Sequence, residues 1–103
     1  MIKVSVLYPN RGDAKFDMNY YVTKHMPMVR QKLGPACKGV AAEQGVAGGA
    51  PGTPPAFVAM GHLLFDSADA FQKAMAPHAA EIMGDIPNYT NIQPVIQISD
   101  VKM

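Results

Sequence analysis

The stretch from Ala56 to Phe65 constrains the fold more than any other part of the chain, because its alternation leaves neither side polar. One side of the extended strand carries Phe57, Ala59, Gly61, Leu63 and Phe65, and the other carries Val58, Met60, His62 and Leu64. In a sheet with one solvated face, apolar and polar residues alternate along each strand. We therefore expect this strand in a sheet that is covered on both faces.

Three further strands are predicted, at Ile2 to Tyr8, Lys38 to Val46 and Asn91 to Val101. The first alternates clearly, whereas the second contains weak strand formers. In the last, Ile92, Ile96 and Ile98 share one side. Pro94 should make the early part of that strand an edge or a bulge, because proline lacks the N–H that a ladder needs.

Two helical regions separate the strands. Asp17 is a suitable N-cap for the first, which we expect in two pieces, 17–25 and 27–33, because Pro27 should break the helix. Gly34-Pro35 is a typical helix end. The second region follows the cap Asp66-Ser67, is interrupted at Pro77 and continues to about Met83.

This order of elements predicts one ferredoxin-like βαββαβ domain over residues 1–103, with a four-stranded antiparallel sheet and both helices on one face. The uncovered face should carry a mixture such as Ser5, Leu7, Val58, Met60, His62, Leu64, Val95 and Gln97, or the complementary set. Both sets are too apolar for water. The chain is 49% apolar and only 17% charged, against about 25% charged in typical domains. We therefore expect a homodimer that packs through its sheet faces.

Charge and composition limit the possible binding partners and the possible cellular compartment. The formal net charge is +1, and no cluster of lysine or arginine suggests nucleic acid or an anionic membrane surface as a partner. The apolar stretches are shorter than the ~20 residues of a membrane-spanning helix. The first residues lack the layout of a signal peptide, and a single cysteine, Cys37, fits a reducing cytoplasm.

His25 is the residue most relevant to function. In a helix, Tyr21 and His25 share a face that Met18, Val22, Met28, Val29 and Leu33 otherwise make apolar. Burying an unpaired imidazole costs about 1–3 kcal/mol, so it needs a partner. Either it binds a backbone carbonyl freed by Pro27, or it faces a pocket as a base, with Tyr21 as its orienter or as an oxyanion donor. Imidazole and phenol titrate near pH 6.5 and 10 in water, which assigns these roles.

Other residues are candidates for binding a small hydrophobic ligand, although ordinary packing explains each of them too. They are Tyr20, Met28, Met60, His62, Tyr89 and Gln97. Three scattered histidines without a neighbouring carboxylate or cysteine argue against a metal site, and we expect no cofactor. Haem stays an alternative, because one histidine is enough to bind it. The loop Gly48 to Pro55 is either a flexible connection or a cover over a site.

The chain resembles the EthD-like family over nearly its whole length. The resemblance rests on Phe16, Tyr20-Tyr21, His25-Met26-Pro27, Phe65-Asp66 and Tyr89-Thr90-Asn91-Ile92-Gln93-Pro94. It implies a dimeric α+β barrel, in which two ferredoxin-like domains join their sheets. The wider superfamily includes cofactor-free monooxygenases, isomerases, polyketide cyclases and haem enzymes, while the activity of the EthD-like family itself is not established.

Two hypotheses follow. The first is a metal-free isomerase, cyclase or cofactor-independent monooxygenase in small-molecule catabolism, with His25 as base and Tyr21 positioning it, acting on a small aromatic or apolar metabolite. The second is a non-catalytic binding or accessory protein for a hydrophobic degradation intermediate. The lack of a second acid or base near His25 in the sequence keeps the second hypothesis open.

Overall fold

All four strands pair into one antiparallel sheet in the computed structural model, which describes residues 1–103. The strands lie in the spatial order β2-β3-β1-β4. They are β1 (Ile2–Pro9), β2 (Gly39–Gln44), β3 (Phe57–Phe65) and β4 (Val95–Asp100). The two long strands that alternate most clearly in the sequence, β1 and β3, therefore form the centre of the sheet.

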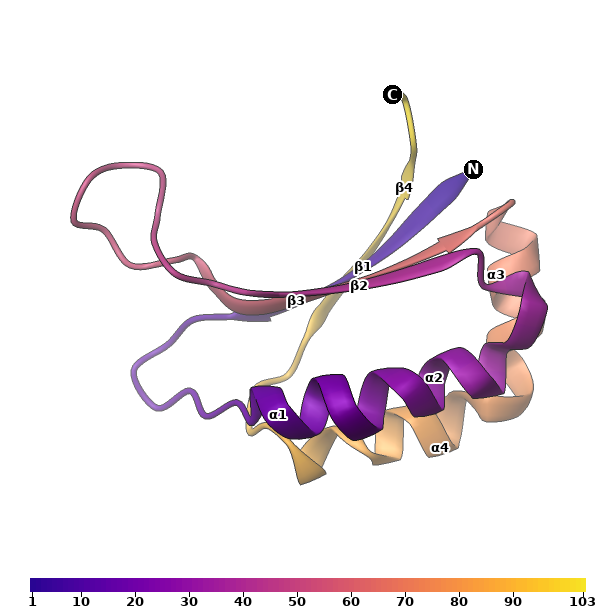
Figure 1. Cartoon of the computed structure of the whole chain (residues 1–103), viewed down its shortest axis with the longest axis horizontal. Helices are drawn as coiled ribbons and strands as arrows, with labels where there is room; N and C mark the ends of the chain where they lie inside the picture. The colour runs from indigo at the N-terminus through magenta and orange to yellow at the C-terminus, as the bar shows by residue number, and fades with distance from the viewer.

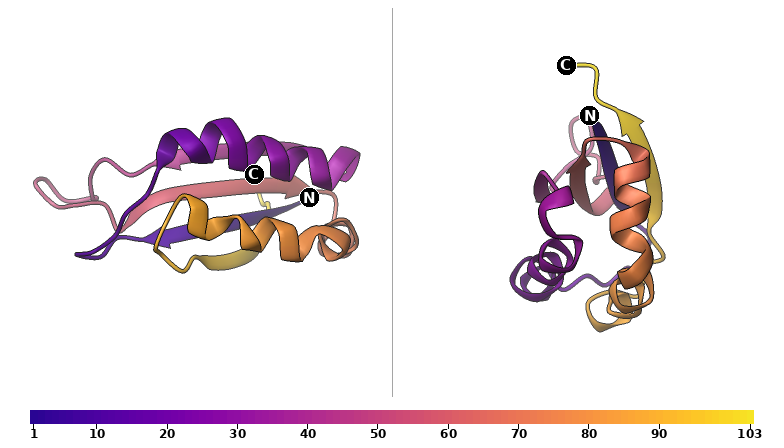
Figure 2. Two further views of the ribbon diagram at one scale, coloured as in Figure 1. Left: turned by 90° about the horizontal axis from the view of Figure 1, so that it is seen from below. Right: turned by 90° about the vertical axis from the view of Figure 1, so that its right-hand side faces the viewer.

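Two helical regions cover one face of this sheet (Figures 1 and 2). The first consists of α1 (Met18–Tyr20), a π-helical turn (Tyr21–His25), α2 (Met26–Leu33) and a 3₁₀ turn (Gly34–Ala36). The second consists of α3 (Ala68–Met75), a 3₁₀ turn (Ala76–His78), α4 (Ala79–Gly84) and a further 3₁₀ turn (Ile86–Asn88). This arrangement confirms the predicted ferredoxin-like fold. Asp17 and Ser67 cap the two regions as expected, each accepting a backbone N–H.

The predicted helix break at Pro27 is wrong, because the first helical region runs without interruption from Met18 to Leu33. A π turn immediately before the proline explains the difference. The Met26 N–H donates to the Tyr21 carbonyl, five residues back instead of four. The wider turn means that Pro27 stands in the first turn of a new α-helical segment, where its missing N–H is tolerated.

The last strand begins four residues later than predicted, at Val95. Before it, Thr90 forms an isolated bridge with Phe16, and Asn91 bonds to the backbone of Asp13 and Lys15. Ile92 is buried in the core, although it is not part of a strand. The segment before Pro94 is therefore held by an isolated bridge and by side-chain hydrogen bonds rather than by the ladder.

The register decides which residues face the helices. Val4 pairs with Leu63, and this layer of side chains is buried under the helices. The opposite layer contains Ser5 paired with His62, Leu7 paired with Met60, and Gln97 paired with Ser5. The face without helices therefore carries the first of the two predicted sets: Ser5, Leu7, Val58, Met60, His62, Leu64, Val95 and Gln97.

The loop between β2 and β3 projects from one end of the sheet (Figure 1). It contributes no residue to the cavity described below. None of the helices has both the length and the apolar character that crossing a bilayer would require.

Candidate active site

The π turn brings His25 into the space between the helices and the sheet. The residue is 4% exposed. Its ring stacks on that of Tyr21, with centroids 5.6 Å apart and an interplanar angle of 14°. The two residues thus share a face as predicted. No hydrogen bond joins the phenol to the imidazole, and the Tyr21 hydroxyl instead lies against Gly61 of β3.

His25 has a carboxylate partner that the sequence did not suggest. Its Nδ1 lies 2.9 Å from Oδ2 of Asp85, which follows α4. The other carboxylate oxygen accepts hydrogen bonds from the Tyr20 hydroxyl (2.7 Å) and from Nδ2 of Asn88 (2.9 Å). The expectation that no acid lies near His25 is therefore wrong, and so is the alternative that a backbone carbonyl satisfies the ring. Asp85 comes from the second helical region, 60 residues away in the chain.

The environment of Asp85 favours its charged form. Burial by itself raises the pKa of Asp85, but hydrogen bonds from Asn88, His25 and Tyr20 together outweigh it and hold the pKa of this carboxyl below its usual value. An ionised carboxylate only accepts hydrogen bonds, so Nδ1 of His25 must donate to it. In the neutral ring, Nε2 then carries the lone pair. Asp85 therefore selects the tautomer of His25.

On its other side, His25 meets a cluster of buried tyrosines. Nε2 lies 3.5 Å from the hydroxyl of Tyr89, and that hydroxyl lies 2.6 Å from the hydroxyl of Tyr8. The rings of Tyr21 and Tyr89 are in contact, with centroids 5.1 Å apart. A chain of polar contacts thus connects Asp85, through the imidazole of His25, to the hydroxyls of Tyr89 and Tyr8.

The buried phenols stay neutral over a wide pH range. Burial is the main reason that the pKa of each of Tyr8, Tyr21 and Tyr89 lies well above the usual value for tyrosine. The hydrogen bond to Asp85 raises the pKa of Tyr20 as well. These hydroxyls are therefore able to donate hydrogen bonds at neutral pH, and none of them is a base there.

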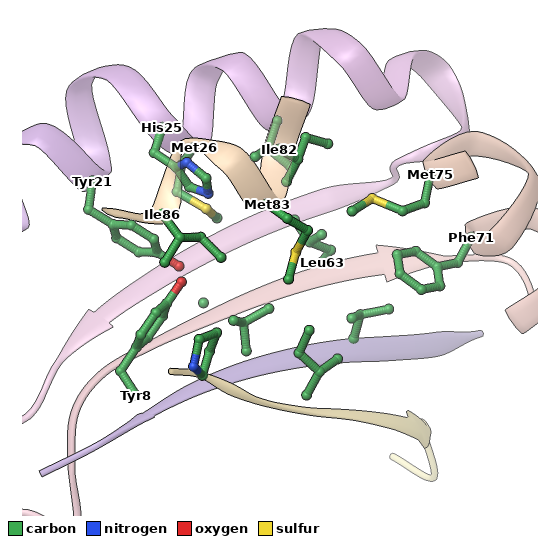
Figure 3. A pocket seen from close by; sticks show the side chains of 16 residues that line it. Tyr8, Tyr21, His25, Met26, Leu63, Phe71, Met75, Ile82, Met83 and Ile86 are labelled. Atoms are coloured by element: carbon green, nitrogen blue, oxygen red, sulfur yellow. The ribbon is translucent and has the colours of Figure 1, made fainter. Parts of the chain in front are cut away.

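A partly open cavity of about 60 Å³ borders His25 and lies between the helices and the sheet. Its volume is several times the roughly 10–15 Å³ that one water needs. At one end, Tyr8 and Tyr21 point their hydroxyls toward one another beside His25, while Phe71 and Met75 close the opposite end (Figure 3). Between the two ends the walls are apolar, and they include Val4, Val6, Met26, Val29, Leu63, Ile82, Met83, Ile86, Pro94 and Ile96.

The predicted site residues do not all gather around this cavity. His25 and Tyr21 line it, and Tyr89 lies directly behind His25. Tyr20 and Met28 line a shallow depression on the outer side of the helices, together with Asp85. Met60, His62 and Gln97 lie on the opposite face of the sheet. There, His62 bonds to Ser5 and Glu43 at 2.9 and 3.1 Å.

Three residues of the site escaped sequence reasoning: Asp85, which bonds to His25, and Tyr8 and Gly61, which line the cavity. A signal existed for Tyr8, because a tyrosine on the buried face of a strand needs a partner for its hydroxyl. No local signal marks Asp85, which stands in a stretch typical of a turn. Gly61 falls in an ordinary alternation, and only the approach of the Tyr21 hydroxyl shows why no side chain is present.

No three side chains of histidine, cysteine, aspartate or glutamate come together in a way that could hold a metal ion. Haem does not fit the space beside His25, because the macrocycle is far larger than the cavity and Nδ1 already bonds to Asp85.

Comparison with known proteins places the chain in a family. The model of the EthD domain matches residues 12–93, which include the helix with His25 and the segment with Asp85 and Tyr89. The chain belongs to the EthD family. The matched part thus contains Tyr21, His25, Asp85 and Tyr89, while Tyr8 lies just before it.

Several relatives of this EthD-family protein are known. An EthD-like protein from Ralstonia eutropha JMP134 has 55% identity and a TM-score of 0.95, covering 99% of this chain and 92% of that one. An uncharacterised 11.0 kDa protein of Rhodococcus erythropolis, from the thcB-thcC intergenic region, is 33% identical to this chain. The alignment covers 88% of this chain and 85% of the Rhodococcus protein.

Two more distant structures share the fold. An ethyl tert-butyl ether D (EthD) family protein from Bacillus halodurans C-125 has 18% identity and a TM-score of 0.67, with 99% of each chain covered. HapK from Hahella chejuensis has 11% identity and a TM-score of 0.59, with 100% of this EthD-family protein and 95% of HapK covered.

Proposed function

We propose that this EthD-family protein binds a small apolar metabolite in the cavity beside His25 and moves a proton on it without a metal. The observation that carries the proposal is the orientation of His25. Its Nδ1 bonds to Asp85, so Nε2, which lies 3.5 Å from the Tyr89 hydroxyl at the edge of the apolar cavity, is the nitrogen that can accept a proton. This is the arrangement expected of a general base with a positioning carboxylate.

The chemistry begins with a carbon acid, a C–H bond next to a carbonyl. The proton passes to Nε2 of His25, and the electron pair moves into the substrate oxygen to give an enolate. Asp85 stabilises the imidazolium that forms, without taking the proton itself. Return of the proton to another carbon completes an isomerisation. In a cyclisation, the carbanion instead attacks a second carbonyl carbon of the same molecule, whose C=O π bond opens and whose oxygen takes the proton from His25. Oxygenation additionally requires dioxygen to accept the electrons.

Tyr8 and Tyr21 line the cavity together with His25, and their hydroxyls lie at that end and suit the developing oxyanion. Neutral donors in a water-poor site stabilise such a charge more strongly than water does, because they are already oriented. In this account, Tyr21 acts on the substrate oxygen, and Asp85 takes the role of orienting His25.

Replacement of His25 tests the catalytic proposal. Small neutral ligands are first screened for those that raise the melting temperature, and each hit is incubated in deuterium oxide. The wild-type protein should incorporate deuterium at the activated carbon, whereas His25→Ala and His25→Gln should not. Mass spectrometry of the recovered ligand provides the measurement. His62→Gln removes a histidine from the other face of the sheet and is the control, expected to behave as wild type.

The same experiment separates catalysis from binding alone. Ligands that stabilise the wild-type protein, yet return with neither deuterium nor a changed mass, would indicate a non-catalytic binding or accessory protein. Deuterium incorporation that survives in both His25 variants would contradict the proposed base.

We also propose a homodimer, formed in the cytoplasm, in which the sheet faces without helices pack together. Apolar residues on that face support this: Leu7, Val58, Met60, Leu64 and Val95. Placing a charge at the centre of the face, as in Met60→Glu, should convert the dimer to a monomer, because the interface would bury a carboxylate among apolar side chains. Sedimentation velocity at micromolar concentration measures the change. A wild-type protein that sediments as a monomer would contradict the proposal.

A further inference from the structure

The polar groups of the cavity are confined to one end. Tyr8, Tyr21 and His25 are its only ionisable lining residues, and 13 of its 16 lining residues are hydrophobic. No lysine or arginine reaches the cavity. Figure 3 shows the two hydroxyls and the imidazole together, with Phe71 and Met75 at the far end.

The charge of the imidazole is also already balanced. When His25 is protonated, the carboxylate of Asp85 lies 2.9 Å from its Nδ1. A second carboxylate brought to the cavity side of the ring would lose its hydration, and the only nearby cation would be one that is already paired. Burying a charge without its own partner is strongly unfavourable. An anionic ligand is therefore disfavoured in this cavity.

A single neutral oxygen, by contrast, needs no counter-charge there. A carbonyl accepts hydrogen bonds from the hydroxyls of Tyr8 or Tyr21, and a phenol also donates to Nε2 of His25. An apolar body then extends toward Phe71 and Met75. Three methionines, Met26, Met75 and Met83, line the space, and their flexible side chains adapt to different shapes.

We infer that the ligand of this cavity is an uncharged molecule with one hydroxyl or carbonyl oxygen at one end, a phenol or a ketone, and that carboxylates and phosphate esters are excluded. The oxygen lies at the end formed by Tyr8, Tyr21 and His25, and the apolar body lies toward Phe71. This inference rests on the proposed binding cavity, and it specifies the class of molecule that the cavity takes.

A matched set of probes tests the inference: para-cresol, cyclohexanone, toluene and para-toluate. Carbon-13 labelling of the methionine methyl groups allows binding to be followed by NMR. Para-cresol and cyclohexanone should shift the signals of Met26, Met75 and Met83, and they should bind at least about tenfold more tightly than para-toluate, a difference of about 1.4 kcal/mol. Toluene should bind more weakly than para-cresol because it lacks the oxygen.

Variants identify the end that recognises the oxygen. Tyr8→Phe and His25→Ala should reduce the preference for para-cresol over toluene, whereas His62→Gln should leave it unchanged. Para-toluate binding as tightly as para-cresol, binding that shifts only the Met60 signal on the other face, or no binding by any probe would each overturn the inference.

The experiments can disprove the proposed catalysis and this inference separately. Selective binding of neutral probes, combined with no deuterium incorporation into any ligand, would leave the ligand class standing and remove the base. Deuterium incorporation into a carboxylate substrate would leave the proposed base standing and would overturn the ligand class.

Discussion

Raising the pH above about 10 should unfold this EthD-family protein steeply. Burial raises the pKa of Tyr8, Tyr21 and Tyr89 in the folded state, whereas the unfolded chain ionises near 10. Their contribution to stability is therefore fully present below pH 10 and is lost as the pH rises toward the folded values. Between the unfolded and folded pKa values, each such phenol removes about 1.4 kcal/mol of unfolding free energy per pH unit. The three together therefore remove about 4 kcal/mol per pH unit.

Because a domain of this size has about 5–15 kcal/mol of stability, unfolding should be complete within about two to three pH units above 10. Circular dichroism and the near-ultraviolet phenolate band, recorded together, measure this. The buried phenolates should appear only as the secondary structure disappears. Tyr21→Phe should reduce the slope by about a third. Ordinary titration of all tyrosines in a folded protein would contradict the account.

Gly61→Ala should destabilise the protein by about 1–3 kcal/mol or more. A Cβ at this position would overlap the hydroxyl of Tyr21, and the ring carbon that bears the hydroxyl would lie 3.3 Å from it. Tyr21 cannot move aside easily, because it is 1% exposed and its ring packs against those of Phe16 and Tyr8, with centroids 5.0 and 5.7 Å away.

A second substitution makes this prediction specific. Adding Tyr21→Phe to Gly61→Ala removes the overlapping hydroxyl and should restore a large part of the lost stability, although Tyr21→Phe alone should destabilise. Urea denaturation of the four proteins gives the coupling energy. Gly49→Ala, where nothing lies within 4 Å of the new Cβ, is the control. If Gly61→Ala lowers the unfolding free energy equally in the wild-type and Tyr21→Phe backgrounds, the Tyr21 hydroxyl does not lie against Gly61.

The fold was predictable because it depends on short-range patterns. Alternation in β1 and β3, the caps Asp17 and Ser67, and the glycine at position 34 each reflect local physics, and they identify the elements and their order. The continuous helix through Pro27 was not predictable in this way. A π turn replaces one hydrogen-bond pattern with another, and no residue type specifies it.

The candidate site was only half predictable, for a different reason. His25 and Tyr21 are neighbours on one helix, so their spacing alone places them together. Asp85 and Tyr8 reach the same site from other elements, and the pairing depends on how the two helical regions pack over the sheet. Met60 and His62 follow the same alternation as the cavity residues, one residue out of phase, so they lie on the opposite face.

The tautomer of His25 tests the central claim most directly, because the whole proposal requires Nε2 to carry the lone pair that accepts the substrate proton. Nitrogen-15 NMR of the labelled imidazole, recorded at a pH above which the ring signals no longer change, distinguishes the two neutral forms. The account predicts a proton on Nδ1, and predicts that Asp85→Asn weakens this preference. A proton on Nε2 in the wild-type protein would contradict it, since His25 could then not act as a base toward the cavity.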